Sequence, residues 1–133
     1  MSTGLTPTYD AAAGIHLAPV TVATYLLHRL HELGVEHVFG VPGDFVLGLL
    51  AAVESSPVQY VGTCNELGAA YAADGYARMR GVGALVTTYA VGELSALNGV
   101  AGAYAEHIPV VVVTGGPPTS AFATEPLLHH TLG

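Results

Sequence analysis

Apolar residues along the chain follow two alternating patterns. Short, nearly continuous apolar runs bounded by Gly, Pro or polar residues are typical of buried strands, whereas longer segments with apolar residues every three or four positions are typical of helices. The runs predict strands at residues 37–41, 58–62, 84–88 and 110–114, and the periodic segments predict helices at about 21–33, 45–53, 66–79 and 93–106. This alternation predicts an α/β fold with a doubly wound, mostly parallel sheet flanked by helices.

The first helix and the last strand carry specific predictions of burial. Thr21 can cap the helix, because its hydroxyl can accept a hydrogen bond from a backbone amide of the first turn. Its apolar face would consist of Val22, Leu26, Leu30 and Leu33. The four consecutive valines at 110–113 predict a strand that is buried on both faces.

Two glycines and the last strand bear on packing. Gly99 and Gly102 lie in the fourth helix, where the lack of a side chain would let a neighbouring helix approach closely. The sequence stops soon after the fourth strand, which would leave that strand as an open edge of the sheet.

Residues 1 to about 18 are small, polar and without period, which predicts a flexible tail ahead of one domain over 19–133.

Composition and charge narrow the class of protein. Apolar residues make up 51% of the 133 residues and charged residues 10%, which excludes disorder over most of the chain. The net charge is −7, and Arg29, Arg78 and Arg80 are the only Lys or Arg residues, so neither nucleic acid nor an anionic membrane is expected as a partner. An anionic ligand would need backbone amides, a metal or another chain to hold it. One Cys and no secretory or membrane-spanning segment suit a cytoplasmic protein.

The fold class itself indicates where a ligand would bind. In open parallel sheets, ligands bind beyond the carboxyl ends of the strands, which here means the loops after residues 41, 62, 88 and 114. Asp44 lies in the first of these loops. It can serve as a turn and capping residue, or as a carboxylate directed into the crevice, and its sequence context leaves both readings open.

Glu66 lies after the second predicted strand, directly behind the capping candidate Asn65. In a purely structural role it would be a carboxylate of the first helical turn, where the helix dipole favours a negative charge. The following helix is almost entirely apolar, and a carboxyl held among apolar groups becomes a proton donor near neutral pH, which makes Glu66 the better candidate for chemistry. Cys64 is expected to be a small buried hydrophobe.

The remaining patterns add little chemistry by themselves. No glycine-rich phosphate loop of the G-x-G-x-x-G or G-x-x-x-x-G-K-[ST] type is present, so this chain is not expected to hold a phosphate. His129 and His130 could be metal ligands, proton shuttles or solvated surface residues. Adjacent side chains of a helix diverge by about 100°, and no H-E-x-x-H or Cys/His cluster is present, so no metal site is predicted.

Four stretches together resemble one known family. They are FGVPGDF (39–45), CNELGAAYAADGYARMRG (64–81), VTTYAVGELSALNGVAGAYAEHIPVV (86–111) and LLHHTLG (127–133). In order and spacing they resemble the amino-terminal pyrimidine-binding (PYR) domain of thiamin diphosphate-dependent 2-oxo acid decarboxylases. Family members usually have Asn where this chain has Gly68. The resemblance implies that the protein is an enzyme that converts a 2-oxo acid to an aldehyde and CO₂.

The resemblance also implies roles for individual residues. Glu66 matches the glutamate that bonds to N1′ of the cofactor's aminopyrimidine and activates it. Asp44, His129 and His130 match the acid–base cluster that handles later proton transfers. The positions that line the pyrimidine pocket correspond to Pro42, Thr88 and Val91.

Length is the main departure from the family, whose enzymes are several times longer. In them a further domain, absent from this chain, holds the diphosphate and Mg²⁺, and the cofactor lies between the PYR domain of one subunit and the diphosphate-binding domain of another. We therefore expect a PYR domain that is incomplete at its C-terminus, inactive alone and part of a homo-oligomer. The alternatives are the PYR subunit of a decarboxylase that is split between two chains, and a non-catalytic fragment that docks on a full-length paralogue.

Overall fold

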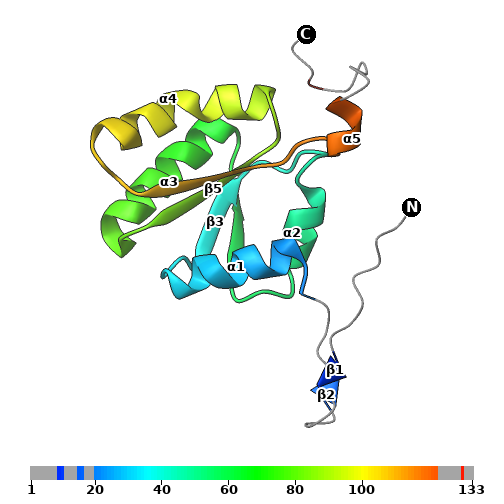
Figure 1. Ribbon diagram of the computed structural model, residues 1–133. Coiled ribbons are helices and arrows are strands. Elements are labelled where there is room, and N and C mark those ends of the chain that lie inside the picture. Colours follow the sequence, from blue (N-terminus) through cyan, green and yellow to red (C-terminus); the bar gives the residue numbers. More distant parts are fainter. Residues whose placement is uncertain (1–8, 11–14, 17–19, 123–129, 131–133) are drawn as a thin grey trace.

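The computed structural model describes residues 9–10, 15–16, 20–122 and 130 (Figure 1). Four strands form one sheet in the order β4-β3-β5-β6, and every neighbouring pair is parallel. The strands are β3 (His37–Gly40), β4 (Gln59–Gly62), β5 (Gly83–Thr87) and β6 (Val110–Thr114). The predicted α/β fold with a parallel sheet is confirmed.

Helices cover both faces of this sheet (Figure 1). On one face, α1 (Val22–Glu32) and α2 (Leu47–Val53) enclose a core with Val38 and Val86. On the other, α3 (Glu66–Arg80) and α4 (Val91–Ala105) pack against Leu85 and Phe39. Successive strand residues point to opposite faces, so each central strand contributes to both cores. The arrangement is the doubly wound one.

Most predicted boundaries agree with the structure within two residues. The prediction missed a short antiparallel pair, β1 (Tyr9–Asp10) with β2 (Ile15–His16), and the helix α5 (Thr119–Phe122). The helix predicted from residue 45 begins at 47, because residues 43–46 form a turn in which the Val46 amide donates to the Gly43 carbonyl at 2.9 Å.

One prediction of burial was right only in part and another was wrong. Of the predicted apolar face of the first helix, Leu30 is buried and Leu26 packs against the core, but Val22 and Leu33 lie exposed, and Leu27 is buried instead. The valine-rich strand β6 lies at the sheet edge and Val112 is 41% exposed, so it is not buried on both faces. The strand that is buried throughout is β5, because it lies between β3 and β6 under two helical layers.

The helices α3 and α4 lie in close contact at one of the two predicted glycines. A Cβ on Gly99 would lie 2.6 Å from the Cβ of Ala70, so only glycine fits between the helices there. Gly102 has no neighbouring atom within 4 Å of such a Cβ, so its predicted role in packing was wrong. Among the helices that the structure describes, none is long and apolar enough to cross a membrane.

The strand order determines where a crevice opens. The chain runs from β3 to β4 on one side, then crosses back to place β5 on the other side of β3. Such a reversal separates the loops that follow the two central strands, and ligands of doubly wound folds bind at this switch point. The loops concerned follow β3 and β5, at residues 41–46 and 88–90.

Candidate functional site

The start of α3 fixes the position of Glu66 near the end of β4. Asn65 has an extended backbone, and its side-chain oxygen accepts a hydrogen bond from the Gly68 amide at 2.7 Å. The preceding Thr63 amide donates to the Gly40 carbonyl at 3.0 Å and ties this turn to the end of β3. As the first residue of α3, Glu66 also benefits from the helix dipole, which favours a negative charge at this end.

Glu66 and Thr88 meet over Gly92. A Cβ built on Gly92 would lie 3.1 Å from Oε1 of Glu66 and 3.0 Å from Cγ2 of Thr88. A Cβ built on Gly43, in the loop after β3, would lie 2.6 Å from the Cβ of Thr88 and 2.9 Å from its Oγ1. The loop after β3 and the start of α4 therefore both pack on Thr88, Glu66 of α3 reaches the same part of α4, and the two glycines leave room for these side chains. We call Gly43, Glu66, Thr88 and Gly92 the glycine-lined cluster.

The hydroxyl of Thr88 is the feature of this cluster that most strongly indicates a ligand site. The residue is 4% exposed, and its Oγ1 is buried with no hydrogen-bond partner among the described residues. Buried hydroxyls are almost always paired, so an orphaned one indicates a missing polar partner. The neighbouring Glu66 is partly exposed, so a ligand could reach its carboxylate. A ligand that can both donate and accept hydrogen bonds could pair with these two groups.

Tyr60 lies close to the same carboxylate from β4. Its hydroxyl donates to the Gly40 carbonyl at 2.9 Å. Burial, together with the nearby negative charge of Glu66, raises the pKa of Tyr60 above its ordinary value of 10.0. Tyr60 and Pro42 also line a cleft of about 650 Å³ formed mainly by α2 and the chain around β4. Glu66 and Thr88 do not line this cleft, but Pro42 does, and it directly precedes Gly43 of the glycine-lined cluster.

The loop after β3 brings further predicted residues to this end of the sheet. Phe45 packs edge-on against Tyr89, with ring centroids 5.2 Å apart, and against His130, with centroids 6.5 Å apart. Asp44, directly before Phe45, lies exposed on the same turn. His129 lies outside the described residues. The structure thus brings the turn that carries Asp44 and the ring of His130 together through Phe45.

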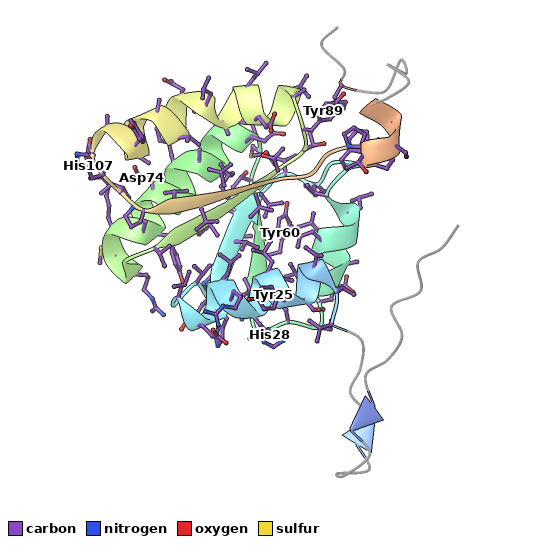
Figure 2. All side chains as sticks on the ribbon, in the orientation of Figure 1. Tyr25, His28, Tyr60, Asp74, Tyr89 and His107 are labelled. Carbon is purple, nitrogen blue, oxygen red and sulfur yellow. The ribbon has the colours of Figure 1, made fainter. Side chains whose placement is uncertain are left out.

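The turn from β5 into α4 has an unusual backbone. Ala90 has φ 58° and ψ −92°, a conformation that residues with a side chain rarely adopt. Its amide donates to Oε2 of Glu93 at 3.0 Å. Val91, the first residue of α4, follows with a half-exposed side chain. Figure 2 shows Tyr89 at the end of the molecule near α5, opposite the end at which Asp74 and His107 lie.

Every arginine of the chain is engaged in an ion pair. Arg29 pairs with Glu32, and Arg80 pairs with Glu36. Arg78 pairs with Asp74 and Glu106. No other Lys or Arg exists in the sequence, so it offers no Lys or Arg outside these ion pairs. Within the described ranges, no group of three or more His, Cys, Asp or Glu residues could hold a metal ion.

Sequence reasoning found part of this site and missed part of it. Cys64 is exposed, so its predicted burial was wrong. The expected enclosure of Glu66 by apolar groups holds only in part, because α3 buries its alanine face instead: Ala69, Ala70, Ala73 and Ala77. Gly92 was missed because the helix was predicted to begin after it. Tyr60 was read only as a strand residue.

Comparison with known proteins gives a consistent set of relatives. A family model described as "Thiamine pyrophosphate enzyme, N-terminal TPP binding domain" matches residues 20–132. An alpha-keto-acid decarboxylase of Mycobacterium leprae is 57% identical over 117 residues, which cover 87% of this chain and 21% of that protein. A pyruvate decarboxylase of Aspergillus fumigatus is 55% identical over 115 residues, or 86% of this chain and 20% of the relative. The chain thus spans about a fifth of the length of these curated relatives.

Proposed function

Because the chain belongs to the thiamine pyrophosphate enzymes, as an N-terminal TPP-binding domain, we propose that it forms the aminopyrimidine half of a thiamin diphosphate site. The complete site would belong to a decarboxylase that converts a 2-oxo acid to an aldehyde and CO₂. The names of the two relatives above support this reaction class, since one is an alpha-keto-acid decarboxylase and the other a pyruvate decarboxylase.

The observation that carries the proposal is the glycine-lined cluster. It sets a carboxylate oxygen of Glu66 and the methyl group of Thr88 around Gly92, and it sets the buried Thr88 hydroxyl, which is unpaired among the described residues, against Gly43. An aminopyrimidine offers ring nitrogens and an amino group that could pair with both. When bound, thiamin diphosphate supplies the electron sink for the bond that breaks as CO₂ leaves. We assign Pro42, Thr88 and Val91 to the walls of the pyrimidine pocket.

Glu66 would hold a proton at its carboxylate, directed to ring nitrogen N1′ of the pyrimidine. Its place at the first position of α3 suits this role, because the capped helix start fixes the backbone. The partial exposure of its side chain leaves one side of the carboxylate open to the ligand. Glu66 is thereby the residue that activates the cofactor.

Asp44, His129 and His130 would move protons at the substrate in later steps. Asp44 is exposed at the switch point, and the ring of His130 lies against the neighbouring Phe45. A carboxylate and imidazoles near one another can donate and accept protons around neutral pH. These groups would protonate the product and assist the release of the aldehyde.

The diphosphate and its Mg²⁺ would be held elsewhere. The arginines of this chain all take part in ion pairs, and the sequence has no phosphate loop. We therefore infer a diphosphate-binding domain in another subunit or chain, with a homo-oligomer as the complete enzyme. The isolated chain of 133 residues would not turn over substrate.

Exchange of the cofactor's C2 proton tests the role of Glu66. In the protein as its cell makes it, together with any chain that co-assembles with it, Glu66→Gln should slow this exchange by about 100-fold or more. Hydrogen–deuterium exchange followed by NMR gives the rate, and circular dichroism checks that the fold is retained. Glu32→Gln, an exposed carboxylate on α1, is the matched control. Equal exchange in Glu66→Gln and the unsubstituted protein would refute the assignment.

Turnover and cofactor affinity together test the acid–base residues. Asp44→Asn and His130→Ala should each lower kcat by about 100-fold and change the Kd for thiamin diphosphate by less than about threefold. Steady-state kinetics and isothermal calorimetry supply the two quantities. Weakened cofactor binding with normal kcat would assign these residues to binding instead of proton transfer.

A further inference from the structure

The turn between β5 and α4 contains a strained residue next to the glycine-lined cluster. Ala90 has φ 58° and ψ −92°, near the classic γ-turn, which is a strained conformation for any residue with a Cβ. The residue is buried, so its conformation is imposed by its surroundings. Strain of this kind persists only where neighbouring contacts hold it in place.

Glu93 provides such a contact. Its Oε2 accepts a hydrogen bond from the Ala90 amide at 3.0 Å, and the Ala90 carbonyl accepts from the Leu94 amide at 2.9 Å. The peptide groups on both sides of the strained residue are thus tied to the first turn of α4. A hydrogen bond to a carboxylate is stronger than one between neutral groups, which suits the task of holding strain.

The strained turn determines where Gly92 lies. Only Tyr89, Ala90 and Val91 separate Thr88 from Gly92, and yet the chain reverses so that Gly92 packs back on the side chain of Thr88. A Cβ on the same glycine would lie 3.1 Å from Oε1 of Glu66. A change in the Ala90 backbone would therefore move Gly92 relative to both polar groups of the cluster.

We propose that Glu93 is a positioning residue: by holding Ala90 in its strained conformation, it sets Gly92 and Thr88 against the carboxylate of Glu66. The inference rests on the proposed function, because it takes the cluster to be the cofactor site. Glu93 acts through the backbone of residues 90–92.

A rescue experiment separates this role from ordinary helix capping. Glu93→Ala should weaken thiamin diphosphate binding about tenfold and slow C2 proton exchange, whereas Glu93→Gln keeps an acceptor and should stay within about threefold. Ala90→Gly should restore binding in the Glu93→Ala background, because glycine adopts the conformation without strain. Calorimetry, C2 exchange by NMR and thermal unfolding are measured on the assembled protein for all variants.

The outcomes distinguish the possible failures. If Ala90→Gly restores the melting temperature and cofactor affinity of Glu93→Ala, Glu93 acts on the Ala90 backbone. If Glu93→Ala binds as well as the unsubstituted protein, or if Ala90→Gly fails to rescue it, the inference is overturned and the proposed function stands. If the unsubstituted protein does not bind thiamin diphosphate, the proposed function fails and this inference fails with it.

Discussion

Tyr60 joins the end of the central sheet to the charge of Glu66. Its hydroxyl donates to the carbonyl of Gly40, the last residue of β3, and Tyr60, labelled in Figure 2, also lines the cleft beside α2. Burial and the Glu66 carboxylate both disfavour the phenolate, so the pKa of Tyr60 is raised. The pKa of Tyr60 is thus sensitive to the charge of Glu66 at the candidate site.

Replacing Tyr60 by Phe should have an effect that depends on pH. At pH 8 the loss of the hydrogen bond to Gly40 should lower the free energy of unfolding by about 1 kcal/mol. Because the folded-state pKa is raised, the contribution of Tyr60 is fully present below pH 10 and is lost as the pH rises through the folded pKa. Urea unfolding at pH 8 and at higher pH should therefore show the gap between the two proteins narrowing.

Tyr104→Phe is the control for this measurement, since Tyr104 is 83% exposed at the end of α4. Its substitution should leave the free energy of unfolding unchanged at both pH values. A gap between Tyr60→Phe and the unsubstituted protein that widens at high pH would contradict the assigned direction of the pKa.

At the scale of residues, the sequence indicates candidate chemical groups but not how exposed they are. Glu66 and Asp44 follow from the rule that ligands bind beyond strand ends, and Thr88 from the resemblance. Their exposure did not follow, because exposure depends on which side of a helix or turn packs on the sheet. Cys64 illustrates this, since a residue one position before a helix cap lies on the outside of the turn.

At the scale of elements, the crossing of α3 and α4 depends on a single missing side chain. Gly99 allows the two helices to approach until its Cα lies against Ala70. The contact is central to the core on this face, which also contains Ala69, Ala73, Leu85 and Ala96. Small residues on both helices make the spacing close, so added volume cannot be absorbed nearby.

Gly99→Ala should therefore destabilise the protein, even though alanine favours helices. We expect the free energy of unfolding to fall by about 1–3 kcal/mol, because the new methyl group would clash with Ala70. Gly102→Ala on the same helix has open space around it and should be neutral or stabilising by up to about 1 kcal/mol. Thermal and urea unfolding of both variants give the comparison, and equal effects would mean that helix propensity outweighs packing.

The elements themselves were predictable because apolar periodicity reflects burial directly. Which elements lie next to one another in the fold was not predictable, as β6 demonstrates. A run of valines indicates a strand, but the sheet order decides whether one or both faces are covered, and that order comes from contacts distant in sequence. In α1 the apolar residues are frequent enough to define two overlapping faces, and packing on α2 and the sheet selected Leu27 and Leu30.

At the scale of the whole molecule, the outer surface of α4 is unusually apolar for a surface that faces water. Its buried face consists of small residues, including Ala96 and Gly99, while large apolar side chains point outward. The outward ones are Val91, Leu94, Leu97 and Tyr104, all 44% or more exposed. A helix that is apolar on both sides is normally covered by other protein.

The isolated chain should consequently self-associate. Sedimentation velocity over a range of concentrations should give species larger than 13.5 kDa, and the double substitution Leu94→Glu/Leu97→Glu should shift the population to monomer. Leu33→Glu, at an exposed apolar residue of α1, should leave the distribution unchanged. A monomer at all concentrations for the unsubstituted chain would contradict this expectation.

The burial of β5 has a consequence for the time scale on which the site can change. All five residues of β5 are buried, with strands on both sides, and Thr88 follows directly. Amide protons in such a strand exchange with solvent only when the whole domain opens, whereas those of an exposed turn such as that of Asp44 exchange through local opening. Thr88 thus follows a strand whose amides should exchange slowly, whereas the exposed turn that carries Asp44, and whose Gly43 lies against Thr88, can open locally. A ligand held between Thr88 and this turn would meet one rigid wall and one wall that can adjust.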